Sequence, residues 1–190
     1  MTSAVWFTVL IALTALERVA ELVVSVRNAR WALSHGGVES GRRHFPPMVA
    51  LHTALLAGCL AEVHLADRQF LPALGWPALV LAVGSQVLRW WCIATLGPQW
   101  NTRVIVVPGL SLVRRGPYRW LRHPNYVAVV LEGVVLPLVH TAWITALVFT
   151  VLNAVLLFGF RIPVEQRALT ASGRRSRASL PAQRGRRHRV

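Results

Sequence analysis

The sequence predicts an all-α integral membrane protein with about five transmembrane helices, of which the last two form a tight hairpin. The first observation is composition: 54% of the 190 residues are hydrophobic, 15% are charged, and the mean hydropathy is +0.47. Soluble domains average roughly 45–50% apolar and about 25% charged residues. The second observation is a series of long apolar segments, and the third is that arginines gather in alternate loops.

Five apolar segments account for most of the chain. Crossing a membrane takes about 20 helical residues, and the first, second, third and fifth segments approach or exceed that length. The fourth has about 13 residues, or about 20 Å of helix, so we expect it to be short or tilted and joined closely to the fifth. Only a helix pairs its own backbone in lipid. The segments are approximately Val5–Val26, Phe45–Leu65, Phe70–Leu96, Tyr126–Leu138 and Trp143–Phe160.

The arginines predict an orientation. All 21 basic residues are arginine, and they concentrate in the loops after the first and third segments and at the C-terminal end. The positive-inside rule therefore places these regions in the cytoplasm and the N-terminus outside. Contact with anionic lipid also accounts for the formal net charge of +14, so we predict no nucleic-acid partner. Residues 170–190 are basic, of low complexity and free of acids, which predicts a disordered tail.

Ionisable or polar side chains within the first, fourth and fifth segments are the most informative. Glu17, Arg18 and Glu21 lie in the first, where Arg18 can reach Glu21 one turn along the helix. Glu132 lies in the middle of the fourth and Asn153 within the fifth. Charges inside a span usually face the bundle interior or a wet cavity. Either an internal ion pair or a cavity lining fits the first group, and either a hydrogen bond across the hairpin or a ligand cavity fits the second.

The loop Gly116–Tyr126, with sequence GPYRWLRHPNY, carries the densest set of functional groups. Pro124 keeps His123 out of the helical conformation and suits the first position of the next helix. We therefore expect His123 at a helix mouth, where free backbone N–H groups attract a carboxylate or phosphate. Arg119 and Arg122 add positive charge. A belt of Arg, Trp and Tyr at the membrane edge explains part of the run but not the His-Pro pair.

This loop, followed by the hairpin and by the run RIPVEQRAL, resembles the isoprenylcysteine carboxyl methyltransferase family over about residues 85–169. The first half of the chain is similar to a bacterial branch associated with lipid O-methylation beside type III polyketide synthases. The resemblance implies a transmembrane methyltransferase-like domain over residues 1–169 that uses S-adenosylmethionine (SAM) on the cytoplasmic side. It also implies a lipophilic acceptor, such as a prenylcysteine, an alkylpyrone or an alkylresorcinol, methylated on a carboxyl or hydroxyl oxygen.

The resemblance also implies site residues. Gln166 replaces the second acid of the family's acidic pair. By its position at the end of the hairpin, Arg161 is expected to pair an anionic acceptor. A carboxylate acceptor needs no base at neutral pH, whereas a phenol does; the candidates are His123 and then Glu132, so Arg161 and Glu132 are the predicted catalytic residues. The predicted cofactor contacts are Tyr118, Arg122, His123, Pro124, Tyr126 and Glu165.

Two other functions remain open at this point. One is a membrane reductase of the sterol type, which uses NADPH, and the other is a catalytically degenerate protein of the same fold. We predict no metal site, because His44, His52 and His64 lack the spacing and the carboxylate or thiol partners of a metal-binding set. The sequence sets no oligomeric state.

Overall fold

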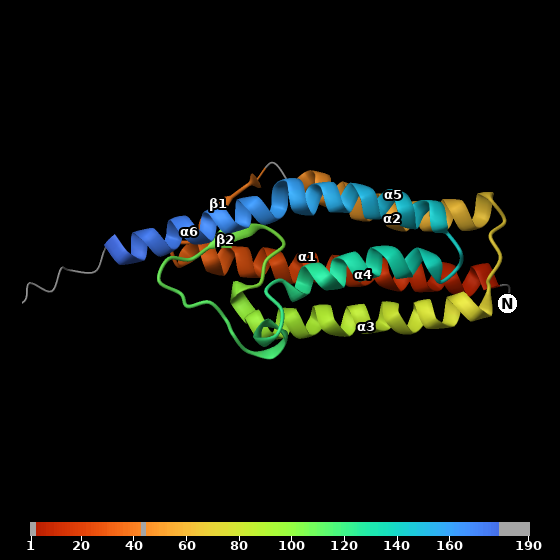
Figure 1. Ribbon diagram of the computed structural model, residues 1–190, viewed down its shortest axis with the longest axis horizontal. Helices are drawn as coiled ribbons and strands as arrows, with labels where there is room; N and C mark the ends of the chain where they lie inside the picture. Colours follow the sequence, from red (N-terminus) through yellow and green to blue (C-terminus); the bar gives the residue numbers. More distant parts are fainter. Residues whose placement is uncertain (1–2, 43–44, 179–190) are drawn as a thin grey trace, which may run out of the picture.

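The computed structural model describes residues 3–42 and 45–178 and is a bundle of long helices that run nearly parallel to its long axis (Figure 1). Its mostly helical architecture confirms the predicted all-α class in outline. Most of the principal helices begin and end close to the predicted apolar segments, but the first continues to Ser34, well past the predicted Val26. They are α1 (Ser3–Ser34), α2 (Phe45–Leu65), α3 (Pro72–Leu96), α4 (Pro124–Leu138) and α5 (Trp143–Leu156).

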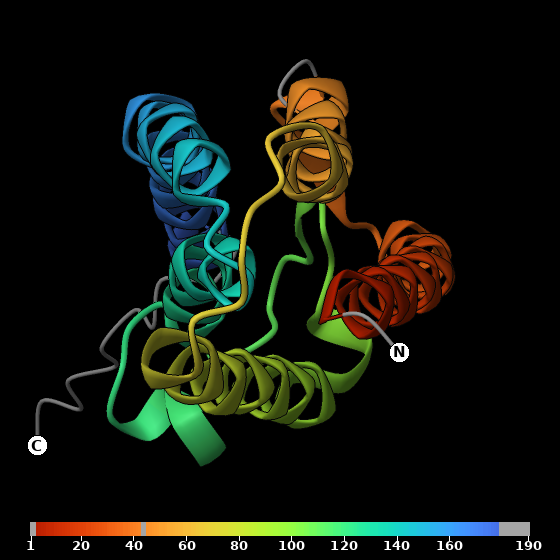
Figure 2. The same ribbon diagram turned by 90° about the vertical axis from the view of Figure 1, so that its right-hand side faces the viewer.

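The helices form a ring when the bundle is viewed along its axis (Figure 2). α4 packs between α3 and α5, and α2 packs between α5 and α1. The apolar core lies toward the N-terminal end of α1, where Phe7 meets Leu55, Leu136 and Phe149 from three other helices. The ends of the helices remote from this core carry the long loops, and they are the ends that build the candidate site.

Three helical stretches among the described residues are long and apolar enough to cross a membrane: Phe45–Leu65, Pro72–Gln99 and Trp143–Ala171. Large apolar side chains also cover the outside of the bundle; for example, Val80 is 70% exposed and Leu147 is 58% exposed. Exposing so many apolar side chains to water is unfavourable, whereas contact with the apolar chains of lipids is favourable. The chain is therefore an integral membrane protein, while the count of five spans and the orientation remain predictions.

The fifth helix does not end where the apolar run suggested. α5 ends at Leu156, one π-helical turn, η4 (Leu157–Arg161), follows, and α6 (Ile162–Ala178) continues from it. α6 therefore runs past residue 170, where the sequence places the start of the basic tail. The remainder of that predicted tail, residues 179–190, lies outside the described residues.

The structure adds one small sheet to the helical prediction. β1 (Val38–Ser40) and β2 (Val104–Val106) pair antiparallel, with Val38 opposite Val106 and Ser40 opposite Val104. Strands of three residues are too short to leave an alternating pattern in a sequence, so only the meeting of two distant loops reveals them. α6 packs against both strands at the end of the bundle. Two short 3-10 turns, η2 (Gly97–Gln99) and η3 (Gly116–Arg119), complete the loops.

Candidate active site

A cavity of about 810 Å³ opens at the end of the bundle where α6, β2 and the loop before α4 meet. Ligand pockets in proteins commonly have volumes of 300–1,000 Å³. Six of the eight site residues predicted from the sequence line it, although they come from two separate stretches of chain. These six are Tyr118, Arg122, His123, Tyr126, Arg161 and Glu165.

The His-Pro pair forms the bend that the sequence predicts. His123 is the N-cap of α4 with φ −136° and ψ 63°, outside the helical region, and Pro124 occupies the first turn. Pro124 is fully buried and does not line the cavity. Its ring fixes the direction in which α4 starts, so Pro124 shapes the site without facing it.

Four of the lining residues form one connected cluster. The hydroxyl of Tyr126 donates a hydrogen bond to the carboxylate of Glu165 and accepts one of 3.1 Å from Nε of Arg161. His123 Nδ1 lies 3.7 Å from Glu165 Oε1, and its ring stacks on the ring of Tyr126 with centroids 5.3 Å apart. His123 and Tyr126, at the start of α4, therefore hold the carboxylate of Glu165 in place. Tyr126 also orients the guanidinium of Arg161.

The π-helical turn explains how Arg161 reaches this cluster. A π-helical turn inserts extra backbone into a helix, rotates the following side chains, and is frequent at functional sites. Arg161 is the last residue of that turn and is 9% exposed. Glu165 follows one turn later in α6. The π-helical turn thus brings the buried guanidinium of Arg161 and the carboxylate of Glu165 to the same wall of the cavity.

Tyr118 enters the cavity from the turn η3. Gly116 begins that turn with φ +56°, and a Cβ there would overlap the side chain of Thr95 on α3. Glycine therefore allows the loop to lie directly on α3. Burial raises the pKa of Tyr118 well above its ordinary value, and its hydroxyl interacts with the Cys92 thiol. Tyr118 is thus a neutral hydroxyl at physiological pH.

The cavity is strongly electropositive. Among its described lining residues, four arginines face a single carboxylate, that of Glu165. Arg103, Arg114 and Asn125 belong to this lining and were not among the predicted residues. Asn125 Oδ1 is buried without a hydrogen-bond partner. Arg103 lies well before the His-Pro loop in the sequence, Arg114 lies just before it, and Asn125 lies within it.

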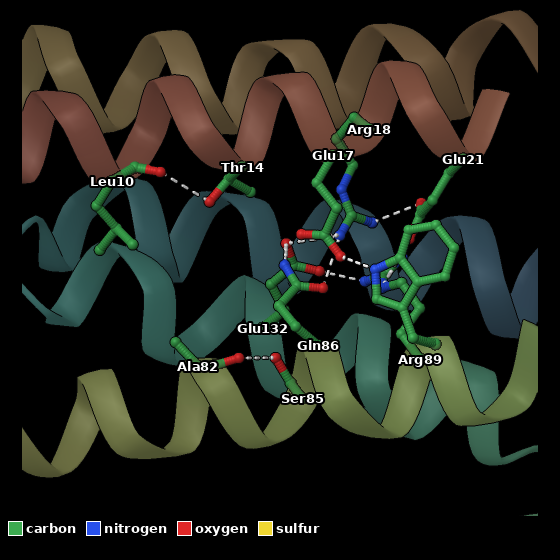
Figure 3. Close-up of polar contacts among 11 residues, drawn as sticks. Leu10, Thr14, Glu17, Arg18, Glu21, Ala82, Ser85, Gln86, Arg89 and Glu132 are labelled. Atoms are coloured by element: carbon green, nitrogen blue, oxygen red, sulfur yellow. Dashed lines mark hydrogen bonds and ion pairs between the residues drawn. The ribbon is translucent and has the colours of Figure 1, made fainter. Parts of the chain in front are cut away.

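Glu132 does not join the other predicted site residues. It does not line the cavity, and its side chain is held in the middle of the bundle (Figure 3). Its carboxylate accepts hydrogen bonds from Arg89 and, at 3.0 Å, from Gln86 Nε2, both on α3. The sequence left two alternatives for Glu132, a hydrogen bond to Asn153 or a place in a ligand cavity, and the structure shows contacts to α3 instead.

The same polar network contains the ionisable residues of α1 (Figure 3). Arg18 Nη1 lies 2.9 Å from Glu21 Oε2, which confirms the predicted ion pair. Arg18 Nη2 also lies 3.4 Å from Glu132 Oε1, so the network joins α1 to α4. The sequence reasoning overlooked Arg89, although an arginine inside the third apolar segment is itself a sign of such a partner.

Comparisons with known proteins identify the family to which the chain is similar. The model of the isoprenylcysteine carboxyl methyltransferase (ICMT) family matches residues 78–171, which include the His-Pro loop, the α4–α5 hairpin and Glu165. The uncharacterized protein YpbQ of Bacillus subtilis is 39% identical over 164 residues, covering 86% of this chain and 96% of that protein.

A second relative is more distant. An uncharacterized protein of Haemophilus influenzae is 24% identical over 156 residues, covering 80% of this chain and 88% of that protein. No solved structure matches the chain. The segment that matches the family model contains the cavity-lining cluster of α4 and α6. The similarity to the Bacillus relative covers nearly the whole length of that relative. This membrane protein belongs to the isoprenylcysteine carboxyl methyltransferase family.

Proposed function

We propose that the protein is a SAM-dependent methyltransferase of the membrane that methylates a carboxyl or hydroxyl oxygen of a lipophilic acceptor. The observation that carries the proposal is the cavity in which Tyr126, Glu165, His123 and Arg161 form one cluster beside the N-terminus of α4. Membership of the methyltransferase family supports the reaction class. Within residues 3–42 and 45–178 the core is helical and contains no parallel sheet for a Rossmann-type cofactor site.

The residues of the cavity fit the functional groups of SAM. Glu165 supplies a carboxylate for the methionine ammonium, and the unpartnered Asn125 Oδ1 is an acceptor for a further donor. The positive end of α4, beside His123, suits the methionine carboxylate. Tyr118 and Tyr126 offer aromatic faces and neutral hydroxyls, and Arg122 adds a donor at the rim. SAM supplies a methyl group activated by its sulfonium.

The charge of the cavity favours an acceptor with an anionic oxygen. Four arginines against one carboxylate attract the anionic oxygen of an acceptor, while Glu165 remains the partner for the methionine ammonium of SAM. Arg161, which is nearly buried and already oriented by Tyr126, is the group that we assign to hold the acceptor oxygen in line with the methyl group. An acceptor carboxylate needs no base; for an acceptor hydroxyl, His123 is the base candidate beside Glu165.

The acceptor would reach this site from the membrane. The outer surface of the bundle is apolar and suits lipid, whereas the cavity lies at one end of the helices, where the arginine-rich loops gather. A lipophilic molecule can therefore keep its apolar part in the bilayer while its polar head enters the cavity. By the positive-inside rule, we assign the cavity to the cytoplasmic side.

Binding of SAM by the purified protein in detergent is the direct test of the site. We expect the His123→Ala variant to lose SAM binding in titration calorimetry, because it removes both the ring that stacks on Tyr126 and the partner of Glu165. His64→Ala is the matched control, since His64 is exposed on α2 and does not line the cavity. Equal SAM affinity in both variants would remove His123 from the cofactor site.

The reaction itself is tested with a total lipid extract and radiolabelled SAM. We expect label to appear in a lipid whose mass rises by one methyl group, and the Arg161→Ala variant to lose transfer while it keeps SAM binding. A parallel titration with NADPH separates the reductase alternative, which predicts binding of NADPH instead of SAM. SAM binding without transfer to any lipid would favour the catalytically degenerate alternative.

A further inference from the structure

Residues 110–122, hereafter the wall segment, combine positive charge with exposed apolar side chains. The segment contains four arginines and no acid. Leu112 is 67% exposed and Trp120 is 68% exposed, and Leu110 and Leu121 are exposed as well. A loop that contacted only water would gain nothing from such residues, whereas arginine with tryptophan and leucine is the composition of protein surfaces at the lipid headgroup level.

The arginines of the wall segment point to a partner outside the protein. Arg114, Arg115, Arg119 and Arg122 are all exposed. None of them forms an ion pair with an acidic residue of the described chain. By contrast, the exposed Arg42 is paired with Glu39 at 2.7 Å. The charge of the segment therefore remains available to an anionic surface.

The position of the segment places that surface in the membrane. The turn η3 projects sideways from the bundle, beyond α3, instead of continuing along the helix axes (Figures 1 and 2). Trp120 meets Trp91 of α3 in an edge-to-face contact with ring centroids 6.0 Å apart. Because α3 is one of the membrane-crossing helices, a loop that extends outward at its end lies over neighbouring lipids.

The inner side of the same segment is a wall of the cavity. Leu110, Leu112 and Arg114 line the cavity together with Tyr118 and Arg122. The wall segment therefore separates the cavity from the lipid layer by the thickness of one loop.

We propose that the wall segment is a binding surface for anionic phospholipid headgroups in the leaflet on the cavity side. The guanidiniums of Arg115 and Arg119, which do not line the cavity, pair with the lipid phosphates. The exposed side chains of Trp120 and Leu121 anchor the loop at the boundary of the acyl chains. Near an anionic surface each arginine contributes roughly a five-fold preference. The proposal concerns lipid binding alone and does not depend on methyl transfer.

Tryptophan quenching by brominated lipids tests this surface. The protein is reconstituted in phosphatidylcholine vesicles that contain an equal minor fraction of brominated phosphatidylglycerol or brominated phosphatidylcholine. We expect stronger quenching by brominated phosphatidylglycerol in the wild type and a clearly smaller excess in Trp120→Phe. The Arg115→Gln/Arg119→Gln variant should lose most of the excess, whereas Arg115→Lys/Arg119→Lys should keep it because the charge is retained.

The matched control is Arg27→Gln/Arg30→Gln, which removes the same charge from two exposed arginines near the end of α1. We expect this variant to keep the excess quenching, because α1 is not part of the wall segment. Equal quenching by the two lipids in the wild type would overturn the proposal. An equal loss in the control variant would also overturn it, because the preference would then come from the overall charge of the protein.

Discussion

At the scale of single residues, Tyr126 links the two charged groups that face the cavity. Its hydroxyl is shared between Glu165 and Arg161. In Tyr126→Phe both groups lose this link, and a hydrogen bond to a charged group contributes about 1.5–3 kcal/mol. We therefore expect SAM affinity to fall by roughly tenfold or more in titration calorimetry. An unchanged affinity, together with an unchanged unfolding temperature, would show that the hydroxyl does not orient the cofactor site.

A substitution at Gln166 is expected to raise the affinity for SAM. Gln166 lines the cavity beside Glu165, at the position where the resemblance expects a second acid. Gln166→Glu adds a negative charge to a cavity that holds four arginines and one carboxylate, so we expect SAM, a cation, to bind several-fold more tightly at low salt and with a smaller gain at high salt. Gln69→Glu, outside the cavity, adds the same charge and should leave the affinity unchanged.

At the scale of elements, the close contact between α4 and α5 depends on a glycine. A Cβ at Gly133 on α4 would overlap the ring of Phe149 on α5. We expect Gly133→Ala to lower the free energy of unfolding by about 1–3 kcal/mol, because the packed ring must move. The measurement is the thermal unfolding midpoint of the protein in detergent.

Gly84→Ala on α3 is the control for this prediction, because a Cβ there meets only open space. It should be neutral, or should stabilise the helix by up to about 1 kcal/mol. Equal midpoints for the two variants would mean that α5 adjusts to the added methyl group at no cost.

The π-helical turn between α5 and α6 is an element that the sequence pattern did not predict. The apolar run predicted one helix to Phe160, and the π-helical turn lies within the end of this run because Leu157, Phe158 and Phe160 are all apolar. An extra backbone residue in a helical turn changes no side-chain property, so neither hydropathy nor periodicity can reveal it. The position of Arg161 in the site could be guessed from the resemblance, but its approach to Tyr126 could not.

At the scale of the whole molecule, the network around Glu132 joins three helices in the middle of the bundle. Glu132 holds Arg89 and Gln86 of α3 and contacts Arg18 of α1. Removing one partner of a buried ion pair costs about 3–5 kcal/mol, because the remaining charge is left without compensation. We expect Glu132→Ala to destabilise the protein by about this amount, measured by thermal unfolding in detergent.

An exposed ion pair gives the comparison for this network. Arg42 pairs with Glu39, but its side chain is 76% exposed, so Arg42→Ala should cost about 0–1 kcal/mol. Glu132→Ala should also leave the SAM affinity of the folded fraction nearly unchanged, because Glu132 does not line the cavity. A specific loss of SAM binding with normal stability would return Glu132 to the active site.

The sequence by itself determined the helical class, the apolar segments and the bend at His123 and Pro124, because hydropathy and proline chemistry are local properties. Family resemblance added Tyr118, Tyr126 and Glu165 to one expected site. Only the tertiary structure decided which charges meet. Glu132 joined the interior network and not the cavity, and Arg103 joined the cavity from an earlier part of the connection between α3 and α4. The physical reason is that the pairing of buried charges depends on which helix faces are adjacent in space, and spacing along one chain does not specify that.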